Sequence, residues 1–313
     1  MQAYNLLRGL LAIWILLGHC SGSITVHTTV FSALQKFNLG CVGIFFFLSG
    51  YGLENSLKRK KDYLHHFLLR KCGSLFIMAA VQFFVSMAFE FILRYHVPIG
   101  TPGEFFHRLF RDINWFVWEL MLLYFLFYLM ARLIRKEGLR LILLFILSIA
   151  FLVLFWALKM GGSWYYSTLA FPAGCALCMY REQGEKEVER HYVPILLMTS
   201  VFAALSAVAA FFTDKAGLLS VCGKNLFCVA LALLGVLILL KLRPEGKILR
   251  YLARISPEIF LYQFTASAIL YAYAIRHKWE ERGLLYALCN LLLTLLFAAV
   301  FSEIRIRLQK KKA

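Results

Sequence analysis

The sequence predicts an all-α membrane protein with about ten transmembrane helices and both termini in the cytoplasm, and three observations carry this prediction. Hydrophobic residues make up 61% of the 313 residues and charged residues only 16%, whereas soluble chains are about half apolar and about a quarter charged. Apolar segments of roughly 17–25 residues, the length that crosses a bilayer, recur along the chain. Lys and Arg gather in alternate connections between these segments.

Ten segments qualify as spans, and no repeat or linker divides them, so residues 1–313 are expected to form a single domain. The second and sixth segments are short, and the eighth contains Lys224, for which the sequence suggests no role. The ten segments are residues 5–24, 38–54, 72–93, 113–134, 139–158, 164–180, 193–212, 217–240, 255–275 and 284–304.

The distribution of basic residues predicts the orientation. Of the 34 Lys and Arg residues, 23 lie in or at the edges of one set of connections and in the C-terminal tail, nine lie in the opposite set, and two, Arg8 and Lys224, lie well inside spans. Cytoplasmic loops carry the excess of Lys and Arg, so both termini are expected in the cytoplasm. The same rule explains the net charge of +17 without nucleic-acid binding.

A basic stretch, LKRKKDYLHHFLLRK, follows the second span and is too charged to cross the membrane. Its alternation of apolar and basic residues predicts an interfacial helix over residues 57–71. Its cations suit anionic lipid head groups or a polyphosphate ligand, and position alone leaves both open. Arg70 and Lys71, nearest the third span, are the candidates for a ligand.

The first span holds two ionisable residues, Arg8 and His19. A charged residue at the centre of a span costs about 2.5–3.5 kcal/mol on insertion scales, so each is a candidate for function. Eleven residues are nearly three helical turns, which puts both on one face through Ala12 and Ile15, about 16 Å apart along the axis. An Arg can bind a phosphate and a His can take a proton from a hydroxyl. The alternatives are an Arg that snorkels to the head groups and a buried core His.

Three other spans carry polar or small residues. Ser49 and Gly50 in the second span let either a neighbouring helix or a bound ligand approach the backbone. In the fourth span, Trp115 stands at the boundary and Glu119 lies inside, where a carboxylate would orient an imidazole or bind a sugar hydroxyl. In the ninth span, two hydrogen-bonding side chains lie within the membrane, Tyr262 and Gln263. Together with Trp115 they are the candidates for substrate binding.

The eight cysteines all fall in or beside apolar stretches and are expected to be buried hydrophobic residues, not a disulfide framework. Cys175 and Cys178 form a C-x-x-C pair, but no second pair or nearby His completes a zinc site. No metal site is expected.

These features together resemble the membrane-bound acyltransferase 3 family, ten-span proteins that modify surface glycans and other acceptors. RGLLAIWILLGH, from Arg8 to His19, has the family's Arg and His separated by ten residues. VGIFFFLSGYGL resembles its aromatic run ending in Ser-Gly-aromatic, here Ser49, Gly50 and Tyr51. The family's order continues in the basic stretch ending LLRK and in the runs NWFVWELMLLYF and ISPEIFLYQF.

The resemblance implies a mechanism in which acyl-CoA enters from the cytosol with its phosphates near Arg8, Arg70 and Lys71. His19 would act as the base or as a transient acyl carrier, and the acyl group would pass to a hydroxyl presented from outside. Three departures from the family pattern stand at Phe67, near Gly73 and at Gln263, where the family commonly has Arg, Pro and His.

Two functions are therefore open. The first is an O-acyltransferase, with acetyl as the family's commonest acyl group, acting on a cell-surface carbohydrate or lipid-linked glycan from acetyl-CoA or another acyl-CoA. The second is a transporter or flippase that uses the same polar residues as a pathway, although transporters more often show interrupted helices in two related halves. The resemblance implies the plasma membrane of a bacterial cell, with membrane lipids as further partners.

Overall fold

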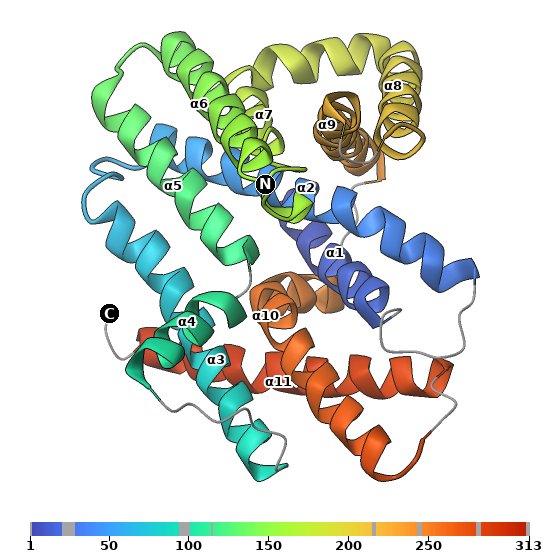
Figure 1. Cartoon of the computed structure of the whole chain (residues 1–313). Coiled ribbons are helices and arrows are strands. Elements are labelled where there is room, and N and C mark those ends of the chain that lie inside the picture. Colours follow the sequence, from blue (N-terminus) through green and yellow to red (C-terminus); the bar gives the residue numbers. More distant parts are fainter. Residues whose placement is uncertain are drawn as a thin grey trace. The chain divides into compact units, whose positions relative to one another are not determined.

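The computed structural model describes residues 2–20, 29–93, 101–113, 115–214, 217–242, 246–279 and 283–310. Helices account for most of these residues, and no strand occurs among them (Figure 1). The α-helices are α1 (Gln2–Cys20), α2 (Thr29–Arg59), α3 (Ser74–Ile92), α4 (Pro102–Asp112), α5 (Trp115–Leu133), α6 (Glu137–Ala157), α7 (Ala170–Met179), α8 (Arg181–Phe211), α9 (Leu218–Leu242), α10 (Lys247–Arg276) and α11 (Leu284–Lys310). A π-helix, η1 (Leu69–Gly73), precedes α3, and a 3₁₀ turn, η2 (Gly162–Trp164), lies between α6 and α7.

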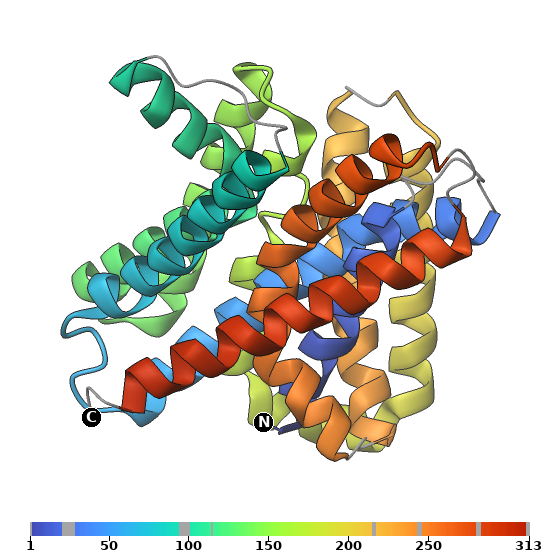
Figure 2. The same ribbon diagram turned by 90° about the horizontal axis from the view of Figure 1, so that it is seen from below.

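The chain folds into two compact units. The first unit comprises Met1–Asn38, Phe76–Asn114 and Glu245–Ala313, and the second comprises Leu39–Leu75 and Trp115–Pro244. In the first unit, α1 packs against α10 and α11. Figure 2 shows α11 (red) running beside α10 (orange). In the second unit, α8 packs along α9, and the part of α2 from Leu39 onward contributes many of the buried residues.

Close helix contacts in both units depend on glycine. In the first unit, Gly9 of α1 lies against the backbone of Leu252 and Ala253 in α10. In the second unit, a Cβ added at Gly174 of α7 would meet the carbonyl oxygen of Phe47 at 1.9 Å. Small residues are what allow membrane helices to pack backbone against backbone.

Within the described part of the chain, seven helices are long and apolar enough to cross a membrane: α2, α3, α5, α6, α8, α9 and α11. They confirm an all-α membrane protein, while the count of ten spans and the orientation stay predictions. The expected sixth span, 164–180, is wrong as a single spanning helix. Its helix α7 has ten residues and is therefore about 15 Å long, half the hydrocarbon thickness of about 30 Å.

The expected continuous helix over 57–71 is not formed, whereas the interfacial location of this segment stays a prediction. Helix α2 continues to Arg59, and turns follow as far as His66. Asp62 and His66 have positive φ values of 54° and 53°, a left-handed conformation that interrupts an α-helix. Tyr63 and Phe67 are buried and anchor the turns, because Phe67 packs on aromatic rings of α5.

Helix α4 lies in a connection for which no helix was predicted. A capping box begins it, since Thr101 accepts a hydrogen bond from the backbone N–H of Glu104 and the Glu104 side chain accepts one from the backbone of Thr101. Proline in the first turn adds to this signal. The motif was readable in the sequence, and it fixes the position of Arg108, which forms an ion pair with Glu90 of α3.

Candidate functional site

His19 lies in the last turn of helix α1 and is exposed, and its ring lies 5.1 Å from that of Phe264 on α10. Ala12 and Ile15, on the same helical face, are fully buried. The face that runs from Arg8 to His19 is therefore packed at its middle, and the imidazole emerges from the packing at its end. A core histidine would be buried, so the exposure of His19 argues against the core alternative, and its catalytic role stays a prediction.

Arg8 is half-buried near the other end of α1. Because the neighbouring Gly9 packs on Leu252 and Ala253, Arg8 lies beside the first turns of α10. These turns carry exposed cations, Arg250 and Arg254 among them. In the sequence these cations indicated only the orientation of the chain. Their closeness to Arg8 follows from the packing of α1 on α10, which the sequence did not predict.

Tyr262 and Gln263 of α10 are both buried, and the structure gives each a neighbour within the first unit. The ring of Tyr262 stacks on Phe301 of α11 with 4.4 Å between centroids. The amide nitrogen of Gln263 donates to the carbonyl oxygen of Phe260, while its buried oxygen has no partner among the described residues. Substrate binding by these two residues stays a prediction.

In the second unit, Glu119 of α5 is completely buried. Its Oε1 accepts a hydrogen bond of 2.8 Å from the hydroxyl of Thr168, and its Oε2 has no partner among the described residues. Trp115, the first residue of α5, is half-buried and meets the ring of Phe116 edge-on at 6.2 Å. A catalytic role for Glu119 and a substrate contact of Trp115 stay predictions.

Asn225 of α9 holds the segment that presents Thr168. Its Oδ1 accepts from the backbone N–H of Leu169 at 3.1 Å, and its Nδ2 donates to the carbonyl oxygens of Tyr165 at 2.8 Å and Val221 at 3.1 Å. Asn225 is fully buried, with both its amide oxygen and its amide nitrogen hydrogen-bonded. The residue supports the neighbourhood of Glu119, a role that the sequence did not suggest.

Lys224, beside Asn225, also has a structural role. Its Nζ lies 3.8 Å from the centre of the Tyr166 ring, a cation–π contact. The contact stabilises a buried cation within the second unit.

We expect Asn225→Leu, which keeps the volume but removes the amide, to destabilise the protein by about 2 kcal/mol. Three hydrogen bonds are lost, and such bonds within membranes average about 0.6 kcal/mol with a maximum of about 1.7. Unfolding of the purified protein in detergent measures the loss. The control is Ser148→Ala, because the Ser148 hydroxyl is buried with no partner among the described residues. Equal effects of the two substitutions would contradict the supporting role of Asn225.

The remaining predicted donor contacts lie on α2 and η1 in the second unit. Ser49 is half-buried, and Gly50 is buried against α7, where an added Cβ would lie 2.1 Å from the carbonyl oxygen of Phe171. Cys175 of α7 also donates to the carbonyl oxygen of Gly50. This geometry gives Gly50 a packing role, and its contact with a donor stays a prediction.

Arg70 is exposed, and its guanidinium turns back onto the chain. Nη2 donates to the carbonyl oxygens of Tyr63, at 3.0 Å, and His65, which closes the turns before η1. Both bonds come from one nitrogen, and a guanidinium has five N–H donors, so Arg70 is able to hold the turns and bind an anion. Lys71 is half-buried in the same π-helix.

The predicted residues thus divide between the two units. Arg8, His19, Tyr262 and Gln263 belong to the first, and Ser49, Gly50, Arg70, Lys71, Trp115 and Glu119 belong to the second. Among the described residues, no group of three or more His, Cys, Asp or Glu side chains is arranged to hold a metal ion. The eight cysteines are free thiols, and five of them are buried.

Comparison with known protein families gives a match over nearly the whole chain. The family model Acyl_transf_3, described as an acyltransferase domain, matches residues 1–303. No match was found among the curated proteins or among the solved structures. The matched region includes every candidate residue described above.

Proposed function

The chain belongs to the acyltransferase 3 family, whose model covers residues 1–303, and from this we propose that it is a membrane O-acyltransferase. It moves an acyl group, acetyl in the simplest case, from cytosolic acyl-CoA to a hydroxyl of an extracytoplasmic carbohydrate or lipid-linked glycan. The observation that carries the proposal is the exposed imidazole of His19, at the end of a helical face that also bears Arg8. The family match supports the enzyme and gives no support to the transporter alternative.

In the proposed reaction His19 is the general base. Its neutral imidazole takes the proton of the acceptor hydroxyl as that oxygen bonds to the thioester carbonyl carbon. The carbon–sulfur bond then breaks, and the CoA thiolate takes up the proton, so that the products are the ester and CoA thiol. In the alternative mechanism, the same imidazole nitrogen attacks the thioester and carries the acyl group transiently, and the acceptor hydroxyl takes that group in a second step.

Arg8 is proposed to bind phosphate groups of the donor. Within the first unit, Arg8 lies beside the start of α10, where exposed cations including Arg250 and Arg254 are found. Clustered cations raise the local concentration of a polyanionic ligand, and an Arg adds bidentate hydrogen bonds to phosphate. Arg70 and Lys71 belong to the second unit and stay separate candidates for a phosphate contact.

We expect Arg8→Ala to weaken acetyl-CoA binding about ten- to a hundredfold, because a hydrogen bond to a charged group contributes about 1.5–3 kcal/mol. Equilibrium binding to the protein in lipid nanodiscs measures the change. Arg307→Ala is the matched control, since Arg307 is an exposed arginine of the first unit that pairs with Glu303. Unchanged affinity in Arg8→Ala would remove Arg8 from the donor site. If the wild-type protein binds no acyl-CoA at all, the enzyme proposal fails, and solute uptake into vesicles becomes the next test.

A further inference from the structure

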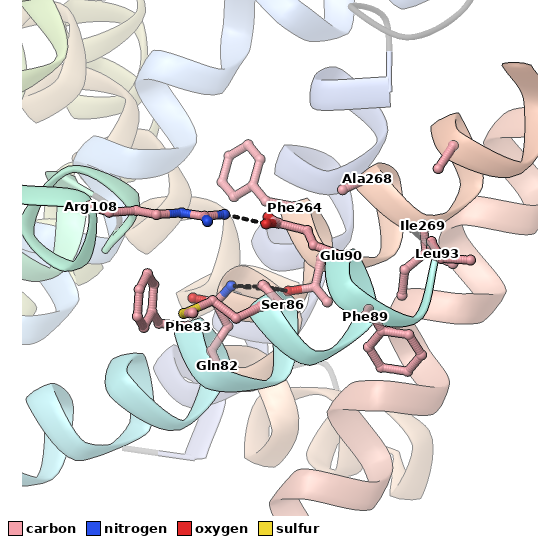
Figure 3. A pocket seen from close by; sticks show the side chains of 13 residues that line it. Gln82, Phe83, Ser86, Phe89, Glu90, Leu93, Arg108, Phe264, Ala268 and Ile269 are labelled. Atoms are coloured by element: carbon pink, nitrogen blue, oxygen red, sulfur yellow. Dashed lines mark hydrogen bonds and ion pairs between the residues drawn. The ribbon is translucent and has the colours of Figure 1, made fainter. Parts of the chain in front are cut away.

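A cavity of about 160 Å³ lies within the first unit between α3, α4 and α10 (Figure 3). None of its lining residues was among the candidates from the sequence. Polar and aromatic side chains mix on its walls, as they do in sites that orient a small ligand. The residues that matter for its chemistry are Gln82, Ser86, Glu90, Arg108, Phe264 and Thr265.

Three of these side chains form a connected hydrogen-bond cluster on one wall. The amide nitrogen of Gln82 donates to the hydroxyl oxygens of Ser86, at 2.9 Å, and Thr265, at 3.0 Å. The two hydroxyl oxygens lie 2.6 Å apart. Gln82 and Thr265 are more than nine-tenths buried. The cluster presents hydroxyl and amide groups, which are able both to donate and to accept hydrogen bonds.

The charged residues of the cavity balance each other. Arg108 reaches from α4 to the carboxylate of Glu90 on α3, and the two form an ion pair (Figure 3). Both residues line the cavity, and the positive charge of Arg108 cancels the negative charge of Glu90. A phosphate-bearing ligand needs unbalanced cations, whereas a neutral ligand with hydroxyl groups suits a paired Arg and Glu together with hydroxyl and amide groups.

The cavity adjoins the candidate base. Phe264 lines it, and the same ring lies 5.1 Å from the ring of His19. One aromatic side chain therefore links the cavity wall to the imidazole. The volume of about 160 Å³ is below the range of about 300–1,000 Å³ typical of pockets for drug-sized ligands. It suits one small unit of a larger molecule, not a nucleotide.

We propose that this cavity is the acceptor subsite and that it binds one uncharged sugar unit of the acceptor. The inference rests on the proposed acyltransferase function and deepens it by assigning the acceptor a binding cavity in the first unit and by limiting the unit bound there to an uncharged sugar. Hydroxyl groups of the sugar exchange hydrogen bonds with Gln82, Thr265 and the Glu90–Arg108 pair. Phe264 separates this sugar from His19, so the hydroxyl that is acylated belongs to the adjoining part of the acceptor.

The test is direct binding of small sugars to the full-length protein in nanodiscs, without acyl-CoA. The probes are methyl α-glucoside and N-acetylglucosamine, with glucose 6-phosphate as an anionic probe of similar size. We expect at least one neutral sugar to raise the thermal unfolding midpoint in a saturable way and glucose 6-phosphate to bind at least tenfold more weakly. Thr265→Val and Gln82→Leu are each expected to weaken sugar binding about tenfold, because hydrogen bonds to the ligand are lost.

Thr294→Val is the matched control, because Thr294 is a buried threonine of α11 outside the cavity, and its hydroxyl has no partner among the described residues. The proposal is overturned if neither neutral sugar binds the wild-type protein, if glucose 6-phosphate binds as well as they do, or if Thr265→Val and Thr294→Val behave alike. Acetyl-CoA affinity, measured separately on the wild-type protein, reports on the proposed function. Sugar binding without acetyl-CoA binding, or the reverse, therefore shows which of the two proposals has failed.

Discussion

Replacing His19 by alanine is expected to lower acetyl-CoA turnover about 10²–10⁴-fold, the range over which a positioned general base accelerates a reaction. Acetyl-CoA binding is expected to survive, because the phosphates are proposed to bind near Arg8, about 16 Å along α1 from His19. Release of free CoA thiol by the purified protein measures turnover, with water as the acceptor. Binding is measured on the same preparation.

A suitable control for His19 exists within the same unit. His277, at the C-terminal end of α10, is also exposed and also lies against an aromatic ring, that of Tyr273 at 4.2 Å. His277→Ala should leave turnover unchanged. Wild-type turnover in His19→Ala, or an equal loss in both variants, would contradict the assignment of His19 as the base.

The second large effect is expected at Gly50, where Gly50→Ala should destabilise the second unit. The added Cβ would lie 2.1 Å from the carbonyl oxygen of Phe171, so α2 and α7 must move apart. Overpacking of this kind costs about 1–3 kcal/mol and at times more. The free energy of unfolding in detergent, measured without acyl-CoA, is the direct test.

Gly184→Ala is the control, because a Cβ at this position in α8 has nothing within 4 Å. Alanine is favoured over glycine inside a helix by roughly 0.5–1 kcal/mol, so this variant should be as stable as the wild type or more so. The same pair of variants decides between the two interpretations of Gly50. If Gly50→Ala keeps its stability but loses acetyl-CoA affinity, the glycine admits a ligand instead of a helix.

Local signals predicted much of the fold. The length and hydropathy of the apolar runs depend only on nearby residues, and for this reason α2, α3, α5, α6, α8, α9 and α11 were expected as helices. The segment 57–71 was predicted wrongly, although Tyr63 and Phe67 have helical spacing. The burial of Phe67 against α5, with Tyr63 packed on the Phe67 ring, stabilises turns with left-handed residues instead. This stabilisation comes from a partner distant in the sequence.

The candidate site divides in the same way. The shared face of Arg8 and His19 follows from helical periodicity within one span, so the sequence alone indicated it. Three features depended on tertiary contacts. Asn225 bonds to residues about sixty positions away, Gly50 meets a carbonyl of α7, and the cavity beside Phe264 is assembled from α3, α4 and α10.

By itself the sequence therefore determined that this is a helical membrane protein, which family it resembles, and which helix carries the candidate base. Only the tertiary structure decided that the imidazole of His19 is exposed, that Gly50 and Asn225 have packing and supporting roles, and that a neutral polar cavity adjoins His19 through Phe264. The reason is physical. Hydropathy and helical periodicity are properties of consecutive residues, whereas burial, hydrogen-bond partners and cavities exist only between segments that folding brings together.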